Sequence, residues 1–133
     1  MSYDPEATRA RILAAAEREL AAYGPAGARV ERIATEAEVN KQGIYHHFGD
    51  KNELLAIVLR RRLDELADTI AIDPAAVDAY AGELFDFHVA HPELVRLVLW
   101  EGLSSQDGPV VDEVARREHY RTKTAALAKA QAN

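Results

Sequence analysis

The polar side chains best suited to chemistry in this sequence lie together in one short segment, Asn40-Lys41-Gln42-Gly43. No large apolar side chain interrupts the segment, so nothing in it needs to be buried. Gly43 weakens a helix by about 1 kcal/mol relative to alanine, and it is better explained if the backbone must approach another molecule closely. Such a segment can lie in the major groove of DNA, with its first turn against base edges and its flanks on phosphates.

Two short helices joined by a tight turn must position this segment. The first helix has an apolar face made by Val30, Ile33, Ala34 and Ala37. The second helix, over about residues 41–46, follows Asn40 as its cap and has Ile44 and Phe48 as its apolar edge. The turn between the two helices falls at residues 38–39. This pattern predicts a helix-turn-helix, and therefore a DNA-binding protein.

Helical periodicity continues along the rest of the chain, and no stretch alternates in the manner of a β-strand. Proline, glycine and capping residues mark the helix ends. We expect seven helices, over residues 5–23, 30–37, 41–46, 51–70, 74–91, 92–103 and 109–129. The predicted fold is all-α, with a three-helix helix-turn-helix head at residues 1–50 and a second helical lobe at residues 51–133.

The net charge of −6 is unevenly distributed along the 133 residues of the chain. Residues 1–62 carry a net charge of +1, whereas residues 63–133 carry a net charge of −7. The acidic second part should repel a nucleic-acid duplex. Only the first part is therefore electrostatically suited to contact DNA.

Several classes of protein are disfavoured by the composition. The sequence has no cysteine, which rules out disulfides and thiolate metal sites. No apolar run approaches the length of a membrane span, and the first residues lack a signal-peptide core. We therefore expect a cytoplasmic protein with no membrane partner. Glycine-rich phosphate loops, cysteine nucleophiles and serine elbows are also missing, so we predict neither an enzyme nor a cofactor.

Beyond these local patterns, the sequence resembles the TetR family of bacterial transcriptional regulators. The residue types and spacing of the family recur at Ile33-Ala34, Val39, Ile44-Tyr45, His47-Phe48 and Lys51-Asn52-Glu53-Leu54-Leu55. Farther along, the segment HPELVRLVLWEGL is similar to the ligand-binding half of family members. The resemblance implies an all-helical homodimer whose two recognition helices read a palindromic operator in double-stranded DNA. It also implies that an unknown small-molecule effector in the second lobe changes their spacing and releases the DNA.

The resemblance assigns DNA-binding roles to individual residues. Lys41 and Gln42 fall where base-contacting residues usually lie. Tyr45, His46 and Lys51 match positions that usually hold phosphates. A phosphate would offset the unfavourable position of the Lys51 cation in the first turn of its helix. The residues predicted to bind DNA are Arg29, Asn40, Lys41, Gln42, Gly43, Tyr45, His46 and Lys51.

The sequence departs from the family pattern at three points. Glu38 replaces the usual glycine of the turn, so we expect a turn that is less favourable or slightly reshaped. Arg29 stands where a small hydroxyl residue often contacts phosphate, and its longer side chain could make the same contact. The chain also lacks two C-terminal helices that family members usually carry. Dimerisation through the sixth and seventh predicted helices is one explanation. The alternative is a truncated or heterodimerising interaction protein without a ligand response of its own.

Apolar and aromatic residues of the second lobe, with a few polar groups among them, could line a pocket for the effector. The predicted pocket residues are Tyr80, Leu84, Phe87, His88, Leu97, Trp100, Glu101 and Tyr120. Ordinary core packing explains most of these residues equally well. His88 and His91 could instead bind a metal ion, with a third ligand from the same lobe, in a metal-sensing regulator. Packing is the stronger interpretation of these histidines, so we predict no metal site.

Overall fold

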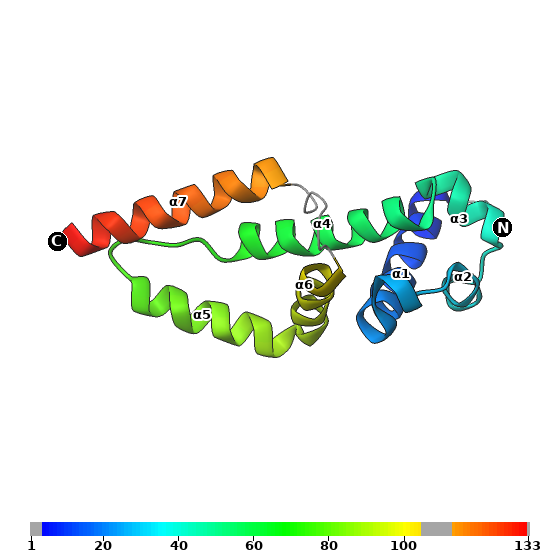
Figure 1. Cartoon of the computed structure of the whole chain (residues 1–133), viewed down its shortest axis with the longest axis horizontal. Helices are drawn as coiled ribbons and strands as arrows, with labels where there is room; N and C mark the ends of the chain where they lie inside the picture. The colour runs from blue at the N-terminus through cyan, green and yellow to red at the C-terminus, as the bar shows by residue number, and fades with distance from the viewer. Residues whose placement is uncertain (1–3, 105–112, 133) are drawn as a thin grey trace.

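In the computed structural model, the described part of the chain, residues 4–104 and 113–132, consists of helices and their connections (Figure 1). The seven helices of this part are α1 (Pro5–Gly27), α2 (Val30–Ala37), α3 (Lys41–Phe48), α4 (Lys51–Thr69), α5 (Val77–Ala90), α6 (Pro92–Ser104) and α7 (Glu113–Ala132). The predicted all-α class is therefore confirmed. None of these described helices is long and apolar enough to cross a membrane.

α1 begins where the sequence predicts, but it extends farther. The Asp4 carboxylate caps the helix by accepting two backbone N–H groups of its first turn. Gly24 has a φ of 73°, and Pro25 follows it without a backbone donor. The predicted stop at these two residues is instead a kink, because helical conformation resumes and continues to Gly27.

A left-handed residue makes the turn between α2 and α3. Glu38 has φ 59° and ψ 42°, a region that glycine enters more easily than any other residue. In this conformation its N–H group bonds to the carbonyl of Thr35, and the N–H of Val39 bonds to the carbonyl of Ala34. Glu38 therefore takes the conformation of the glycine it replaces, and the carbonyls at the end of α2 are satisfied.

Side-chain caps begin α3 and α4 at the predicted residues. The Asn40 Oδ1 accepts the N–H of Gly43 at 2.7 Å, and the Asp50 Oδ1 accepts the N–H of Glu53 at 2.8 Å. α3 runs to residue 48, farther than predicted, and its last side chain packs into the core. Gly49, with a φ of 87°, then ends the helix.

One hydrophobic core joins the first four helices to α6. Its largest fully buried side chains are Ile12, Ile33, Ile44 and Leu54 from the first four helices, and Leu97 from α6. Because Leu97 belongs to this core, the head and the second lobe share packing at their junction. An ion pair adds to the contact, since Arg62 of α4 lies 3.2 Å from the Glu17 carboxylate of α1.

The second lobe is more open than the head. A small apolar cluster of Ile70, Phe87 and Leu94 joins the end of α4 to α5 and α6. α5 and α7 lie on opposite sides of the C-terminal half of α4 (Figure 1). α7 has no buried residue within its described length. The apolar surface of this lobe is therefore only partly covered.

The boundaries of the last helices differ from the predicted ones. α5 begins at Val77, three residues later than predicted. The reason is local, because the Asp73 carboxylate accepts the N–H of Ala75 and closes a turn instead of capping a helix. α7 is described from Glu113 onward, and its predicted start at residues 109–112 lies outside the described residues.

Candidate nucleic-acid interface

α3 has a buried edge and an exposed side. Ile44 and Phe48 anchor the helix in the core, with only 1% and 5% of their surface exposed. Because this apolar edge sets the rotation of the helix, the polar residues project outward. The exposed side chains of α3 and its cap are Asn40, Lys41, Gln42, Tyr45 and His46. The structure thus brings the predicted DNA-binding residues of α3 together on the outer side of the head.

The remaining residues predicted to bind DNA flank this helix or lie within it. Arg29 is exposed just before α2, and Lys51 is half-buried at the start of α4. Gly43 is half-buried inside α3. A Cβ at Gly43 would come within 3.3 Å of the Asn40 Oδ1. The glycine therefore leaves room for the Asn40 cap.

Lys41 is held by a carboxylate that the sequence analysis did not single out. Its Nζ lies 2.7 Å from the Glu31 Oε1 of α2, and also 5.8 Å from the centroid of the Tyr45 ring. The hydrogen bond from Lys41 lowers the pKa of Glu31, and the same bond raises the pKa of Lys41. The two residues of this ion pair lie on different helices, on either side of the turn, so the residue spacing within one helix does not predict it. A negative charge therefore accompanies the predicted base-contacting cation.

Two arginines of α1 hold the helix-turn-helix from behind. Arg11 Nε donates to the carbonyl of Ala37 at 3.2 Å. Arg9 Nη1 donates to the carbonyl of His47 at 3.4 Å, and its guanidinium lies 4.5 Å from the Phe48 ring centroid. Both carbonyls lie at the C-terminal ends of helices, where acceptors lack a partner within the helix and cations are favourable. These two basic residues tie the C-terminal ends of α2 and α3 to α1.

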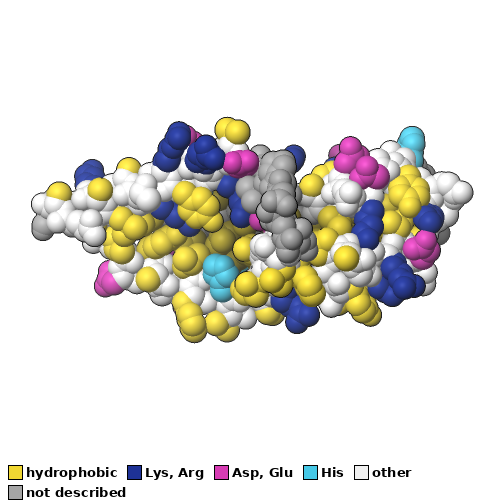
Figure 2. Space-filling model, in the orientation of Figure 1, with side chains coloured by type: hydrophobic (Ala, Val, Ile, Leu, Met, Phe, Trp, Pro, Cys, Tyr) yellow, Lys and Arg dark blue, Asp and Glu magenta, His cyan; other side chains and the backbone are white. Residues whose placement is uncertain are grey.

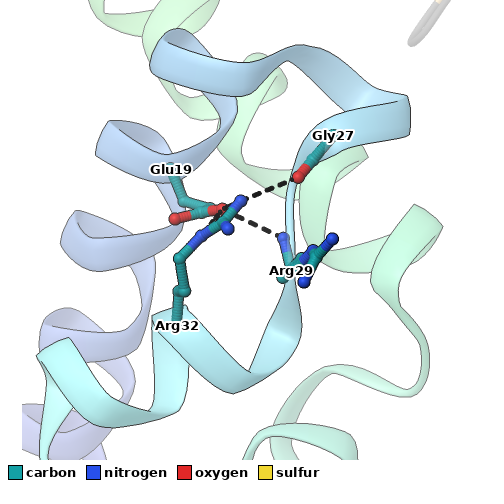
Figure 3. A network of polar contacts seen from close by, with 4 residues as sticks. All are labelled: Glu19, Gly27, Arg29 and Arg32. Carbon is teal, nitrogen blue, oxygen red and sulfur yellow. Dashed lines mark hydrogen bonds and ion pairs between the residues drawn. The ribbon is translucent and has the colours of Figure 1, made fainter.

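A buried glutamate fixes the start of α2 to α1 (Figure 3). The Glu19 Oε2 accepts the backbone N–H of Arg29 at 3.0 Å and the Nε of Arg32 at 2.8 Å. Arg32 also donates to the carbonyl of Gly27 at 2.9 Å and lies over the Tyr23 ring at 4.1 Å. The Arg29 guanidinium points away from the Glu19 carboxylate (Figure 3), so the hydrogen bond of Arg29 within this network comes from its backbone N–H.

The charge of Glu19 is set by this network. Burial on its own would raise the pKa of Glu19. The hydrogen bonds from Arg32 and from the Arg29 N–H, together with the charges of both arginines, outweigh burial and hold the pKa below its ordinary value of 4.5. The hydrogen bond to Glu19 in turn raises the pKa of Arg32. The pair is therefore ionised at neutral pH.

The carbonyl of Ala21 links α1 to α6. In a regular helix it would accept the N–H of the residue four positions later, but Pro25 has none. Arg96 Nε donates to this oxygen at 2.8 Å, and Trp100 Nε1 donates to it at 3.2 Å. The Trp100 ring lies against Gly24, where a Cβ would come within 2.8 Å of it. α6 is therefore fixed to the kink of α1.

The structure does not bring all of the predicted pocket residues to one cavity. Leu97 lies in the core of the head, and Trp100 lies on the kink of α1. Phe87 is buried, and its ring stacks on that of His91 with 4.1 Å between the centroids. These three predicted residues take part in packing between helices.

Three other predicted pocket residues lie at or beside a cleft between α4 and α7. Tyr120 lines this cleft. Lys123, also in its wall, has its Nζ 5.6 Å from the ring centroids of both Tyr80 and Tyr120. Glu101 lies 2.7 Å from Arg116, another residue of the wall. The two aromatic residues here are among those predicted from the sequence, whereas the two cations, Arg116 and Lys123, are not.

The histidines of α5 and its end contact the helix backbone. The His88 Nδ1 lies 2.7 Å from the carbonyl of Leu84, and the His91 Nδ1 lies 2.9 Å from the carbonyl of Phe87. Among the residues that the structure describes, no three His, Asp or Glu side chains are placed to share a metal ion. The contacts of His88 and His91 with carbonyls of their own helix fit the interpretation that these histidines serve packing.

α2, the left-handed turn and α3, held against α1 and α4, form a helix-turn-helix, and this arrangement defines the class of the protein. Comparison with known families agrees with the fold. Residues 12–58 match the model described as bacterial regulatory proteins, tetR family, and residues 76–133 match that of the tetracyclin repressor-like C-terminal domain. The chain belongs to the TetR family, as its resemblance predicted.

Individual relatives match different shares of the chain. It is 48% identical to the HTH-type transcriptional repressor SCO4008 of Streptomyces coelicolor over 124 residues, or 93% of this chain. The crystal structure of SCO4942 from Streptomyces coelicolor covers 73% of it, with a TM-score of 0.72 and 44% identity. A structure assigned to the TetR family, from Mesorhizobium loti MAFF303099, covers 98% with a TM-score of 0.67 and 21% identity, a likeness of fold alone. The chain spans 65%, 54% and 66% of the lengths of these three proteins.

Proposed function

We propose that the chain is a non-enzymatic transcriptional repressor that binds double-stranded DNA through α3. The observation that carries the proposal is the exposed polar side of α3, opposite an edge anchored by the buried Ile44 and Phe48. A helix held in this way can enter the major groove and place Lys41 and Gln42 at base edges. The relative SCO4008 is named an HTH-type transcriptional repressor, which supports the same function.

The proposed phosphate contacts come from residues around the base-reading turn. Tyr45, His46 and Lys51 flank it, and Arg29 lies exposed before α2. A phosphate beside Lys51 would also offset the unfavourable interaction of this cation with the N-terminal end of α4. Each cation that neutralises a phosphate releases counterions, so affinity should fall steeply as the salt concentration rises.

We further propose a cytoplasmic homodimer that reads a palindromic operator, with half-sites about 34–36 Å apart or a multiple of that distance. Large apolar side chains exposed on two helices support a partner surface. Phe85 and Val89 on α5 are 68% and 64% exposed, and Leu99 and Leu103 on α6 are 60% and 71% exposed. Figure 2 shows apolar side chains gathered along the edge of the molecule formed by these helices. Exposed apolar groups of this size are typical of interaction sites.

The proposed response to a ligand depends on how the lobe at residues 51–133 is joined to the head at residues 1–50. α4 begins directly after the head and shares its hydrophobic core, and α6 is bonded to α1 at Ala21. A ligand can shift the spacing of the two heads of a dimer only if it binds one arrangement more tightly than the other. The connection through α4 and the bonds between α6 and α1 can both transmit a change in the lobe to the head.

Two substitutions test the proposed DNA contacts. Lys51→Ala should weaken binding to every sequence and reduce the slope of log affinity against log salt by about one, because a phosphate contact is lost. Gln42→Ala should instead alter the preferred base at one position, at a cost of about 1–3 kcal/mol. Selection of bound DNA from a random pool, followed by titration at several salt concentrations, measures both effects. Equal effects of both substitutions on every DNA would contradict the assignment.

The exposed apolar side chains of α5 and α6 also favour a second candidate, an interaction protein that heterodimerises with a related chain. Light scattering, combined with the same DNA titration, separates the two. A dimer with operator affinity supports the homodimeric repressor. A strict monomer without operator affinity supports the heterodimerising protein.

A further inference from the structure

A cleft of about 250 Å³ lies between α4 and α7. Leu63 and Leu66 of α4 provide its apolar side, and His119 and Lys123 of α7 provide polar groups opposite them. In the left half of Figure 2, apolar side chains are gathered next to α7, and Lys and Arg side chains lie among those along α7. The volume is that of about eight water molecules in the liquid, so an occupant would have a single ring or a short chain.

Lys123 is the cation best placed to bind an occupant of this cleft. Its Nζ lies 5.6 Å from the ring centroids of Tyr80 on α5 and Tyr120 on α7, so aromatic groups from two helices surround the ammonium. None of the ion pairs formed among residues 4–104 and 113–132 includes Lys123. Its charge can therefore be neutralised by a bound anion without breaking an existing pair.

The other charged groups of the cleft leave it positive. Arg116 is in an ion pair with a glutamate of α6, at 2.7 Å. Arg60 and Asp64, both on α4, carry opposite charges. Burial, followed by the nearby charge of Lys123, lowers the pKa of His119, so its ring is neutral at neutral pH and offers a hydrogen bond. The charge of Lys123 remains unbalanced, and the cleft should attract an anion.

We propose that this cleft binds a small monocarboxylate whose apolar body is a single ring or a short alkyl chain. The carboxylate would accept hydrogen bonds from the Lys123 ammonium, and the apolar body would pack against Leu63 and Leu66. A neutral molecule of the same shape would lose the charge-assisted bond, and a cation would be repelled. This inference rests on the proposed function, because it names the chemical class of the effector for the regulatory lobe.

Binding at this cleft would also strengthen the attachment of α7 to α4. α7 has no buried residue within its described length, so its own apolar contacts contribute little. A ligand that contacts Lys123 on one helix and the two leucines on the other bridges both. Because the unfolded chain lacks the site, the ligand should raise the melting temperature of the protein.

Benzoate, benzamide and benzylamine test the proposal, because they share one ring and differ in charge. Calorimetric titration of the full chain, without DNA, should show benzoate binding at least about tenfold more tightly than the other two. Lys123→Met keeps the length of the side chain and removes its charge, and it should reduce benzoate affinity by about the same factor. Lys129→Met, on the same helix but outside the cleft, is the matched control and should leave the affinity unchanged.

Three results would overturn the inference: no benzoate binding at millimolar concentrations, equal affinity for benzamide, or an equal loss in Lys123→Met and Lys129→Met. The ligand series on the unchanged chain decides the question even where a variant fails to fold. A chain that binds its selected DNA but not benzoate keeps the proposed function and loses this inference. A chain that binds benzoate but no DNA keeps the carboxylate site and loses the proposed function.

Discussion

The indole N–H of Trp100 donates a hydrogen bond to the carbonyl of Ala21, 3.2 Å away and 79 positions earlier in the chain. The carbonyl is available because Pro25 cannot supply the N–H that a helix would place there. α6 of the second lobe is thereby fixed to the helix that supports α2. A displacement of α6 would act on the head through α1 as well as through α4.

The contact between α1 and α6 predicts that Gly24→Ala is strongly destabilising. Gly24 has a φ of 73°, and an added Cβ would come within 2.8 Å of the Trp100 ring. Backbone strain and overpacking together should lower the free energy of unfolding by about 2–4 kcal/mol. Urea denaturation followed by circular dichroism measures the change. Gly82→Ala is the control, because its Cβ would meet nothing within 4 Å inside α5, and it should stabilise the helix by up to about 1 kcal/mol. Similar losses in both variants would show that the contact with Trp100 has no special role.

The left-handed turn predicts that Glu38→Gly stabilises the protein. Glu38 has φ 59°, where a side chain is unfavourable by roughly 1 kcal/mol relative to glycine. Part of the gain is offset by the greater freedom of glycine in the unfolded chain, so the net increase in the free energy of unfolding should be about 0.5 kcal/mol. Thermal unfolding measures it. Glu36→Gly, within α2, should instead destabilise by about 1 kcal/mol. A loss of stability in Glu38→Gly would refute the assignment of strain to this turn.

The network around Glu19 predicts a pH-dependent stability. The folded pKa of Glu19 lies below its ordinary value of 4.5, so its ionised form stabilises the fold above that pH. This stabilisation should be lost as the pH falls below 4.5 and through the folded pKa. Glu19→Gln should lower the free energy of unfolding by about 1–3 kcal/mol at neutral pH. The difference between the two proteins should shrink in acid, as measured by denaturation at a series of pH values. A difference that stays constant below pH 4.5 would count against this role.

The ion pair between Lys41 and Glu31 predicts that Glu31→Gln tightens DNA binding. The Lys41 Nζ lies 2.7 Å from the Glu31 carboxylate, which competes with phosphates and bases for the ammonium. Removing this charge should raise affinity for all DNA by about threefold to tenfold at low salt, and by less at high salt. Glu118→Gln, on α7, makes the same change in net charge far from the head and serves as the control. Equal gains in both variants would attribute the effect to net charge alone.

The helices and their caps could be predicted from the sequence because the interactions that form them are local. The Asn40 cap bonds to a residue three positions later, and so does the Asp50 cap. The apolar edge made by Ile44 and Phe48 is likewise visible as a helical repeat. These short-range patterns were sufficient to predict a helix-turn-helix with Lys41 and Gln42 beside its exposed turn.

The tertiary structure alone decided which partners these residues meet. Lys41 pairs with Glu31, which is ten positions earlier in the chain. Glu19 accepts the backbone N–H of Arg29, which is ten positions later. The ring of Trp100, in α6, packs against the kink of α1. Helical periodicity shows which face of a helix is apolar, but it does not show which other helix covers that face. Contacts between distant segments depend on how whole helices pack, and no spacing within one helix encodes that arrangement.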